Sequence, residues 1–431
     1  MHWREYGVIV KDKLGQTSTI TFAEVATHNH FVLDRSGKIF KQTAPVIKLP
    51  AEASEEDHLG LLGLLNSSVA CFWLQQVCHN KGGPGGGSSK DEKWHDFYAF
   101  NSTKVAEFPL VDSRPVDLST RIDIQARQLA ASQPEALLTA THAGTQTPPT
   151  RASLDAARDQ SARLRHQMIA GQEELDWRCY RYYGLLPANG RASDFEHAAP
   201  PEVALGERAF EIVMARRIAA GTLQTSWFKW LGIAPITVIP ERWPSDYRAL
   251  VQQRIDLIES DRSISLMESP NCKRRWEATP WDTLEHAALR EGLLARLELQ
   301  RYWATSPDHP PQLTSTSRLA DAARMDTDFM QLAALYAGHA DFDPGQLVAQ
   351  LVASEATPFL PVLRYTEAGL RKRNQWEDTW SLQRREDAGE DVGKIPVPPK
   401  YKSTDFLKTE VWRLRGGLDV PKERWISYPG C

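Results

Sequence analysis

The chain has 431 residues, which is enough for two or three domains with separate cores. Its hydrophobic fraction of 42% and charged fraction of 25% are ordinary for a soluble globular protein. The formal net charge is −4, so the chain is not a polycation. Any nucleic-acid site must therefore be a local basic patch, or lie in a cleft shared with other sequence.

Cysteine usage and hydropathy predict the compartment. The five cysteines include no CxxC pair, and their odd number disfavours a disulfide scaffold or a cysteine zinc cluster. The first residues, MHWREYGVIVKDK, lack the apolar core of a signal peptide. No stretch approaches the roughly 18 apolar residues that a membrane span needs. We therefore predict a cytoplasmic protein with no membrane partner.

Residues 1–131 have the pattern of a small β-rich module with one long helix. Short alternating runs predict strands at 7–10, 18–22, 30–34 and 38–40. Ser54, followed three residues later by Asp57, predicts the start of a helix that continues to the glycines at 82–83. Residues 94–108 then predict one or two further strands.

The rest of the chain is predicted to be mostly helical. Residues 132–150 are rich in Ser, Thr, Pro and Ala and predict a linker. A long helix is expected from Thr150 or Ser153 to about Tyr183, inside a helical domain at 151–357. Residues 358–431 read as an irregular basic-aromatic segment, which we expect to be truncated. The predicted fold class is α+β, with a β-rich module followed by a mostly α-helical C-terminal region.

A glycine-rich segment, GGPGGGSSKDEKW, follows the predicted helix. Gly82 and Gly87 have the gap of a phosphate-binding P-loop, but the required Lys-Ser/Thr pair does not follow. Two interpretations remain. The segment is a solvated connection, or it contacts DNA and uses Lys81, Lys90 and Lys93 to neutralise phosphates.

Two further patterns resemble catalytic or metal sites without completing one. Asp91-Glu92-Lys93 has the acidic-x-Lys order of a metal-dependent nuclease, but no upstream aspartate partner is evident. His28 and His30 have strand spacing onto one face, yet no third ligand is evident, so a surface position is favoured. We expect no metal site in this chain.

The order of several motifs points to a family. An apolar helical run, the glycine-rich segment and FYAFNSTKVAEFPL follow one another between residues 59 and 110. EELDWRCYRYYG comes next, and LRYTEAGLRKR, IPVPPKYKSTDFL and LDVPKERWISYP lie near the end. In this order, from about Val25 to Pro429, the chain resembles PglX-type adenine-specific DNA methyltransferases of type 2 BREX (phage growth limitation) defence systems.

The resemblance implies a function and a set of partners. Family members methylate adenine N6 at a specific DNA sequence, with S-adenosylmethionine as cofactor, in phage defence. It implies double-stranded DNA, a catalytic half and other BREX components as partners. It also implies that Asn66 and Ser67 support a DNA-facing surface, whereas local helix capping explains the same residues without DNA.

The catalytic signature of such an enzyme is not visible. Adenine methyltransferases need a cofactor loop and an (Asp/Asn/Ser)-Pro-Pro-(Tyr/Phe/Trp) tetrapeptide that holds a flipped base. The four Pro-Pro pairs, at 148–149, 200–201, 310–311 and 398–399, lack these neighbours. We therefore expect no catalytic or cofactor-binding residues in this chain, a catalytic half elsewhere, and no activity from this chain alone.

Lysines and arginines are the candidates for contacting DNA phosphates. An ordinary surface role is the alternative for the lysines, and an ion-paired docking surface is the alternative for the basic tail. For the whole chain, the competing hypothesis is a protein-interaction scaffold that docks other defence-system components. The candidates are Lys41, Lys48, Lys81, Lys90, Lys93, Lys104, Arg371, Lys372, Arg373, Lys400 and Lys402.

Overall fold

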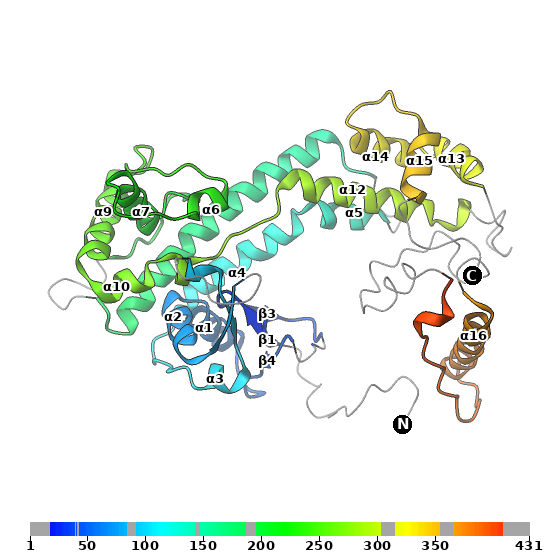
Figure 1. Cartoon of the computed structure of the whole chain (residues 1–431), viewed down its shortest axis with the longest axis horizontal. Helices are drawn as coiled ribbons and strands as arrows, with labels where there is room; N and C mark the ends of the chain where they lie inside the picture. The colour runs from blue at the N-terminus through cyan, green and yellow to red at the C-terminus, as the bar shows by residue number, and fades with distance from the viewer. Residues whose placement is uncertain are drawn as a thin grey trace. The chain divides into compact units, whose positions relative to one another are not determined.

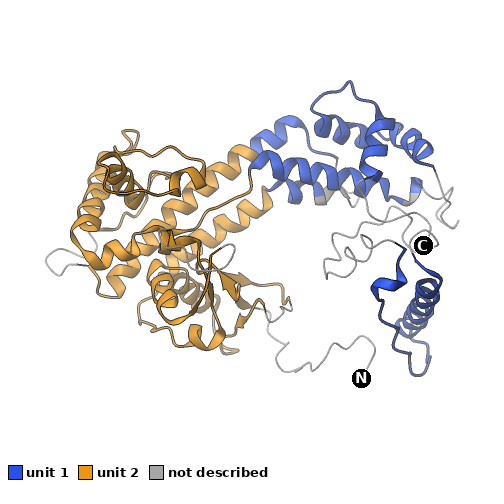
Figure 2. Cartoon of the chain, in the orientation of Figure 1, with its two compact units in different colours: residues 1–9, 133–157, 280–431 blue, residues 10–132, 158–279 orange. Residues whose placement is uncertain are grey.

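The computed structural model describes residues 18–38, 40, 43–83, 92–142, 147–186, 195–302, 315–353 and 365–407 (Figure 1). Within them the α+β fold class is confirmed: small antiparallel sheets come first and helices dominate afterwards. The chain divides into two compact units (Figure 2). One unit contains 10–132 and 158–279, and the other contains 1–9, 133–157 and 280–431. The domain boundaries expected at 131, 150 and 357 stay a prediction.

Two three-stranded antiparallel sheets open the first unit. One has the order β3-β1-β4 and the other β2-β6-β5. In the first sheet, Ile20 pairs with Leu33 and Phe22 with Phe31, and all four side chains are buried. The expected strand at 7–10 lies outside the described residues. The strands are β1 (Thr19–Phe22), β2 (Val25–Ala26), β3 (Phe31–Asp34), β4 (Val46–Ile47), β5 (His79–Gly82) and β6 (Phe97–Ala99).

The long helix expected after Ser54 is in fact two helices and a strand. Ser54 and Asp57 do form a capping box, and α1 covers Glu55–Leu65. Ser67 caps α2, Ser68–Val77, by accepting a bond from the backbone N–H of Ala70 at 3.1 Å. Local capping therefore breaks the apolar run, and β5 replaces the expected end of the helix.

The region expected as strands at 94–108 is also mixed. It contains the short 3-10 helix η2 (Lys93–His95), then β6, then α3 (Ser102–Ala106). Asn101 caps α3 through its side chain, which accepts a bond from the backbone N–H of Lys104 at 2.9 Å. An Asn-Ser-Thr start of this kind favours helix over strand.

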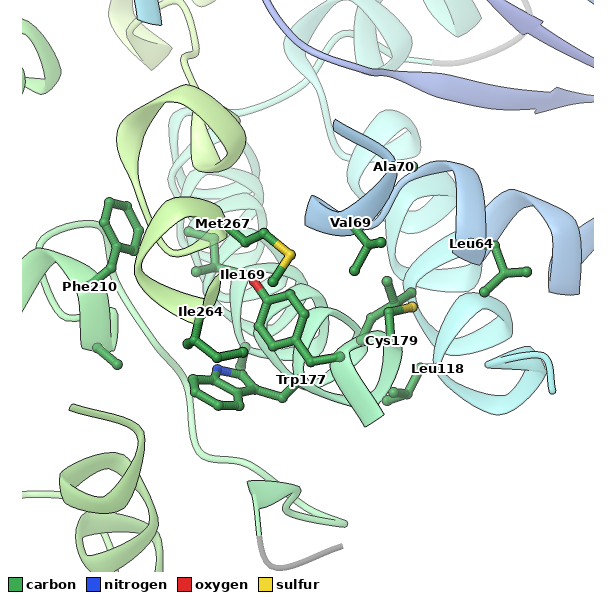
Figure 3. Packing of buried hydrophobic residues seen from close by; sticks show 14 of the residues in the cluster. Leu64, Val69, Ala70, Leu118, Ile169, Trp177, Cys179, Phe210, Ile264 and Met267 are labelled. Atoms are coloured by element: carbon green, nitrogen blue, oxygen red, sulfur yellow. The ribbon is translucent and has the colours of Figure 1, made fainter. Parts of the chain in front are cut away.

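The remaining helices of this unit enclose its core. Figure 3 shows Leu64, Leu118, Ile169, Trp177 and Ile264 packed among them, and all five are nearly inaccessible to solvent. The long α6, expected from Thr150 or Ser153 to about Tyr183, supplies many of the buried side chains. The helices are α4 (Val116–Ala131), α6 (Arg151–Tyr182, in this unit from residue 158), α7 (Ala209–Ala219), α8 (Trp227–Leu231), α9 (Ser245–Ser260), α10 (Arg262–Met267) and α11 (Pro270–Lys273).

The second unit is helical in the residues described. The segment expected as a linker at 132–150 contains α5, which packs against α12. Leu138 of α5 is fully buried with Leu293, Leu297 and Phe329. The helices are α5 (Pro134–His142), α12 (Trp281–Leu297), α13 (Thr316–Arg324), α14 (Thr327–Ala337) and α15 (Pro344–Ala353), with the 3-10 turn η4 (Gln300–Tyr302).

The basic-aromatic segment is more ordered than its sequence predicts. Instead of irregular structure with short helices it contains the 21-residue helix α16, Glu367–Asp387, and the 3-10 turn η6, Ser403–Asp405. Tyr365 and Phe406 are buried against each other and against Tyr401. Residues 408–431 lie outside the described part. No described helix is both long and apolar enough to cross a bilayer.

Candidate functional site

The Asn66-Ser67-Ser68 turn joins the β-rich part to α6. Asn66 forms two 2.9 Å hydrogen bonds with the backbone of Phe31, accepting from its N–H and donating to its C=O. The Asn66 amide thus continues the edge of β3 as another strand would. Ser68 donates its backbone N–H and its hydroxyl to the two carboxylate oxygens of Asp176, at 2.7 and 2.8 Å. The turn is structural, and it fixes the sheet against α6.

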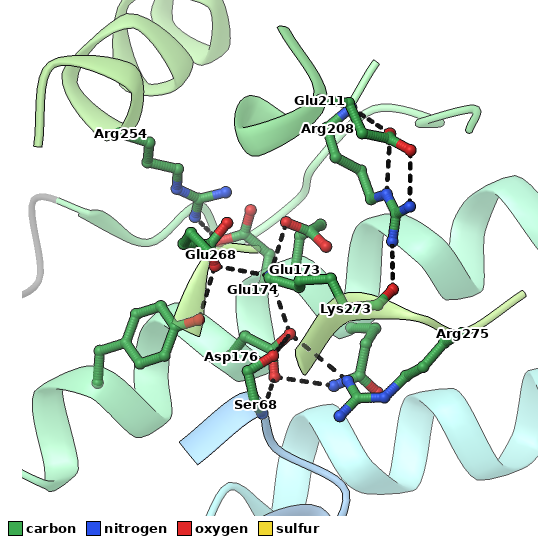
Figure 4. A network of polar contacts seen from close by, with 12 residues as sticks. Ser68, Glu173, Glu174, Asp176, Arg208, Glu211, Arg254, Glu268, Lys273 and Arg275 are labelled. Carbon is green, nitrogen blue, oxygen red and sulfur yellow. Dashed lines mark hydrogen bonds and ion pairs between the residues drawn. The ribbon is translucent and has the colours of Figure 1, made fainter. Parts of the chain in front are cut away.

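Asp176 belongs to a buried ionic network centred on Lys273 (Figure 4). The Lys273 ammonium lies 3.0 Å from Glu173, 3.0 Å from Asp176 and 2.7 Å from Glu268. Tyr180 donates its hydroxyl to Glu268 at 2.6 Å. All of these side chains are buried. Burial opposes the charged amine, but the three carboxylates outweigh it and hold the pKa of Lys273 above its usual value.

Two further buried pairs extend the network to α7 and α9. Arg208 contacts Glu211 at 2.7 Å and donates to the backbone oxygen of Lys273 at 3.1 Å. Arg254 contacts Glu174 at 2.7 Å. Because each charge has a partner, the network fixes α6, α7, α9 and α11 in one arrangement rather than adding much net stability.

We expect Glu173 to make the stability of this unit depend on pH. Burial raises the pKa of Glu173 to about 7, although Lys273 partly opposes the shift. A carboxyl with a raised pKa binds its proton more tightly when folded, so its contribution is present at low pH and is lost as pH rises from about 4.5 towards 7. We expect Glu173→Gln to gain stability relative to wild type across this window. Urea unfolding at about pH 5 and pH 8 would measure the gain, and a difference independent of pH would contradict it.

Segment 273–276 leads from the buried Lys273 to half-buried residues nearer the surface. After the buried Lys273, Arg274 donates to the backbone oxygen of Trp94 at 3.0 Å, and Arg275 donates to the side chain of Asn29 at 3.1 Å. Trp276 has φ of 77°, the one non-glycine with positive φ among the residues that the structure describes. Such backbone strain persists only where surrounding contacts enforce it.

In the acidic-x-Lys triplet at 91–93, Glu92 forms structural contacts with the segment before α8. The carboxylate of Glu92 accepts bonds from the Thr225 hydroxyl, the Ser226 hydroxyl and the Ser226 backbone N–H, just before α8. These contacts dock η2 onto α8. Trp94 follows, with its ring centroid 5.2 Å from Trp227. Asp91 lies outside the described residues.

The histidine pair lies beside the arginines. The rings of His28 and His30 are 6.5 Å apart and nearly parallel. Burial, with the nearby positive charge of Arg275 and a smaller contribution from His30, lowers the pKa of His28 to about 3, so the ring is neutral. Among the described residues, no group of three or more His, Cys, Asp or Glu is placed to hold a metal ion.

The predicted DNA-contacting lysines of the first unit lie on separate elements. Lys48 follows β4, Lys81 is on β5, and Lys93 is in η2, and all three are exposed. Lys104, on α3, forms a 2.7 Å ion pair with Glu107. Lys41 and Lys90 lie outside the described residues.

The three predicted DNA-contacting cations of α16 are paired with acids. Spacings of three or four residues along a helix place side chains on one face, which favours such pairs. Lys400 and Lys402 are exposed. The ion pairs join Arg371 to Glu367 at 3.4 Å, Lys372 to Asp405 at 2.6 Å and Arg373 to Glu377 at 2.5 Å. The ion-paired interpretation of this segment thus has geometric support.

The sequence did not predict the buried network around Lys273 or the role of segment 273–276. It gave no role to the acids Glu173, Glu174 and Asp176, and none to residues 273–275. The signal that could have found them is the placement of the three acids beside Leu175 and Trp177, which are both buried.

Comparisons with known proteins identify the family of this chain. A family model described as a domain of unknown function (DUF7008) matches residues 168–431. The adenine-specific methyltransferase PglX of Streptomyces coelicolor is 47% identical over 438 residues, a match that covers 99% of this chain and 36% of that protein. The chain thus spans about a third of the length of this relative. No solved structure matches the chain. The resemblance to PglX-type adenine-specific methyltransferases is therefore confirmed, and the chain belongs to the DUF7008 family.

Proposed function

We propose that this chain is the DNA target-recognition and C-terminal portion of a site-specific adenine N6 DNA methyltransferase that acts in phage defence. The observation that carries the proposal is the 47% identity to PglX across 99% of the chain. We assign S-adenosylmethionine binding and methyl transfer to sequence that this chain does not cover. The chain's four Pro-Pro pairs lack the neighbours that hold a flipped adenine, which supports this assignment.

In this proposal the unit of 10–132 and 158–279 presents a rigid surface to double-stranded DNA in the cytoplasm. The buried network around Lys273 holds that surface in one arrangement, which reduces the ordering cost of binding. Exposed lysines such as Lys48, Lys81 and Lys93 neutralise phosphates and set the register. Other side chains read base edges, and a catalytic half flips and methylates the adenine.

A protein-docking role is the second candidate, and one observation favours it for residues 365–407. The cations Arg371, Lys372 and Arg373 are engaged by acidic side chains, so less positive charge is available for phosphates. In this alternative the segment docks other BREX components, and DNA binding is incidental.

Salt dependence separates the two roles. We expect the purified chain to bind a mixed-sequence duplex in fluorescence anisotropy, with an affinity that falls steeply with salt. A surface that neutralises about four phosphates would lose roughly 100-fold in affinity between about 50 and 200 mM salt. Absence of binding at low salt, or an affinity that salt does not change, would overturn DNA recognition by this chain and leave the docking role.

A further inference from the structure

The docking of η2 onto α8 produces an aromatic cluster with one member near the surface. Trp94 and Trp227 are buried, whereas Trp230 is only half-buried. Ring centroids of Trp94 and Trp230 are 4.9 Å apart, and His95 lies 6.3 Å from Trp230. The indole of Trp230 is therefore held by aromatic neighbours and still reaches solvent.

A guanidinium is fixed against the same indole. The central carbon of Arg274 lies 4.6 Å from the ring centroid of Trp230 and 5.6 Å from that of Trp94. The bond from Arg274 to the backbone oxygen of Trp94 sets its orientation. Lys273, the preceding residue, is anchored in the buried network, so the Arg274 backbone has little freedom. The guanidinium and the indole form a preorganised cation–π pair.

Two exposed lysines, Lys93 and Lys229, stand next in the sequence to Trp94 and Trp230 of this cluster. Lys93 of η2 and Lys229 of α8 are exposed, and neither has an ion-pair partner among the residues that the structure describes. Glu277 lies 3.4 Å from Arg274 and is largely exposed. The carboxylate of Glu92 accepts bonds from residues 225–226 and also lies 3.8 Å from the His95 ring nitrogen. The touching segments η2 and α8 thus expose lysines beside an aromatic platform.

This combination fits one class of ligand. Lysines neutralise a phosphate backbone, and a fixed aromatic ring stacks on a base or sugar that has left the duplex stack. We propose that Lys93, His95, Lys229, Trp230 and Arg274, called here the η2–α8 patch, bind the DNA strand next to the target site. In this patch Lys93 and Lys229 contact phosphates, and Trp230 with Arg274 holds an unstacked nucleotide. The inference rests on the proposed DNA-recognition function and assigns it a surface.

The lysine pair provides the first test. We expect Lys93→Ala/Lys229→Ala to bind a duplex more weakly than wild type and to reduce the slope of log affinity against log salt by about 1.8, or about 0.9 for each lost phosphate contact. The control is Arg248→Ala/Arg262→Ala, which removes the same charge from exposed positions on α9 and α10. The control is expected to keep the wild-type slope.

The aromatic platform provides the second test. We expect Trp230→Ala to weaken binding to a single-stranded oligonucleotide by roughly 5- to 150-fold, and Trp230→Phe to retain most of the affinity because it keeps a stacking ring. Circular dichroism and thermal melting compare the folding of each variant with wild type. If Trp230→Ala does not fold, the exposed lysine pair decides the proposal.

The outcomes separate this inference from the proposed function. If wild type binds DNA but the lysine-pair variant keeps the salt slope of wild type and of the control, the η2–α8 patch is not the contact surface and the inference fails. If Trp230→Ala folds and binds as tightly as wild type, the stacking role fails. If wild type itself does not bind, the proposed function fails, and the inference fails with it.

Discussion

We expect Lys273→Met to lower the free energy of unfolding by about 3–5 kcal/mol. The substitution keeps the volume of the side chain but leaves Glu173, Asp176 and Glu268 close together in a buried site without their shared cation. Mutual repulsion and lost solvation then act on all three carboxylates. Protonation of Glu173, whose pKa is already raised, relieves only part of this cost.

Chemical denaturation followed by tryptophan fluorescence and far-UV circular dichroism would measure this loss. Lys229→Met is a matched control, because it makes the same substitution at an exposed position of the same unit. We expect the control to change stability by no more than about 0.5 kcal/mol. A loss below about 1 kcal/mol for Lys273→Met would show that water or a rearranged partner compensates the carboxylates.

Local sequence signals predicted the parts of the fold that depend on neighbouring residues. The Ser54–Asp57 capping box and the long helix α6 follow from spacing alone. Local capping at Asn66 and Ser67 is one of the two interpretations that the sequence offers, but the sequence does not show what fixes the break. It depends on Phe31, which lies 35 residues earlier and whose backbone pairs with the Asn66 amide. A tertiary partner of this kind cannot be seen in helical periodicity.

The candidate site was harder to predict for the same reason. Lys273 meets Glu173 and Asp176 across about 100 residues of sequence, and nothing in a single sequence joins them. The ion pair of Arg371 with Glu367 could have been predicted in advance, since the two residues have helical ion-pair spacing. Because residues 358–431 were expected to be mostly irregular, the helical spacing of Glu367 and Arg371 was not used to predict an ion pair. Trp94 and His95, which follow Lys93, pack against Trp230 of α8, a helix more than 130 residues later in the sequence.

Trp177 lies in the same segment of α6 as Glu173 and Asp176. Removal of its indole is expected to lower the free energy of unfolding about as much as Lys273→Met does. Trp177 is fully buried, with its ring 5.3 Å from Tyr180 and stacked 5.6 Å from Phe195. The guanidinium of Arg254 lies 5.1 Å from the same ring while it pairs with Glu174. The ring therefore packs against both the apolar core and one of the buried ion pairs.

We expect Trp177→Ala to lower the free energy of unfolding by about 3–5 kcal/mol, because the cavity left by an indole cannot collapse between α6 and α9. Trp177→Phe keeps an aromatic face towards Phe195 and Arg254, so its loss is expected to be clearly smaller. Trp380→Ala, at a position on α16 that is 44% exposed, is a second comparison and is also expected to lose less. Equal losses for Trp177→Ala and Trp380→Ala in urea unfolding would contradict the central role given to this indole.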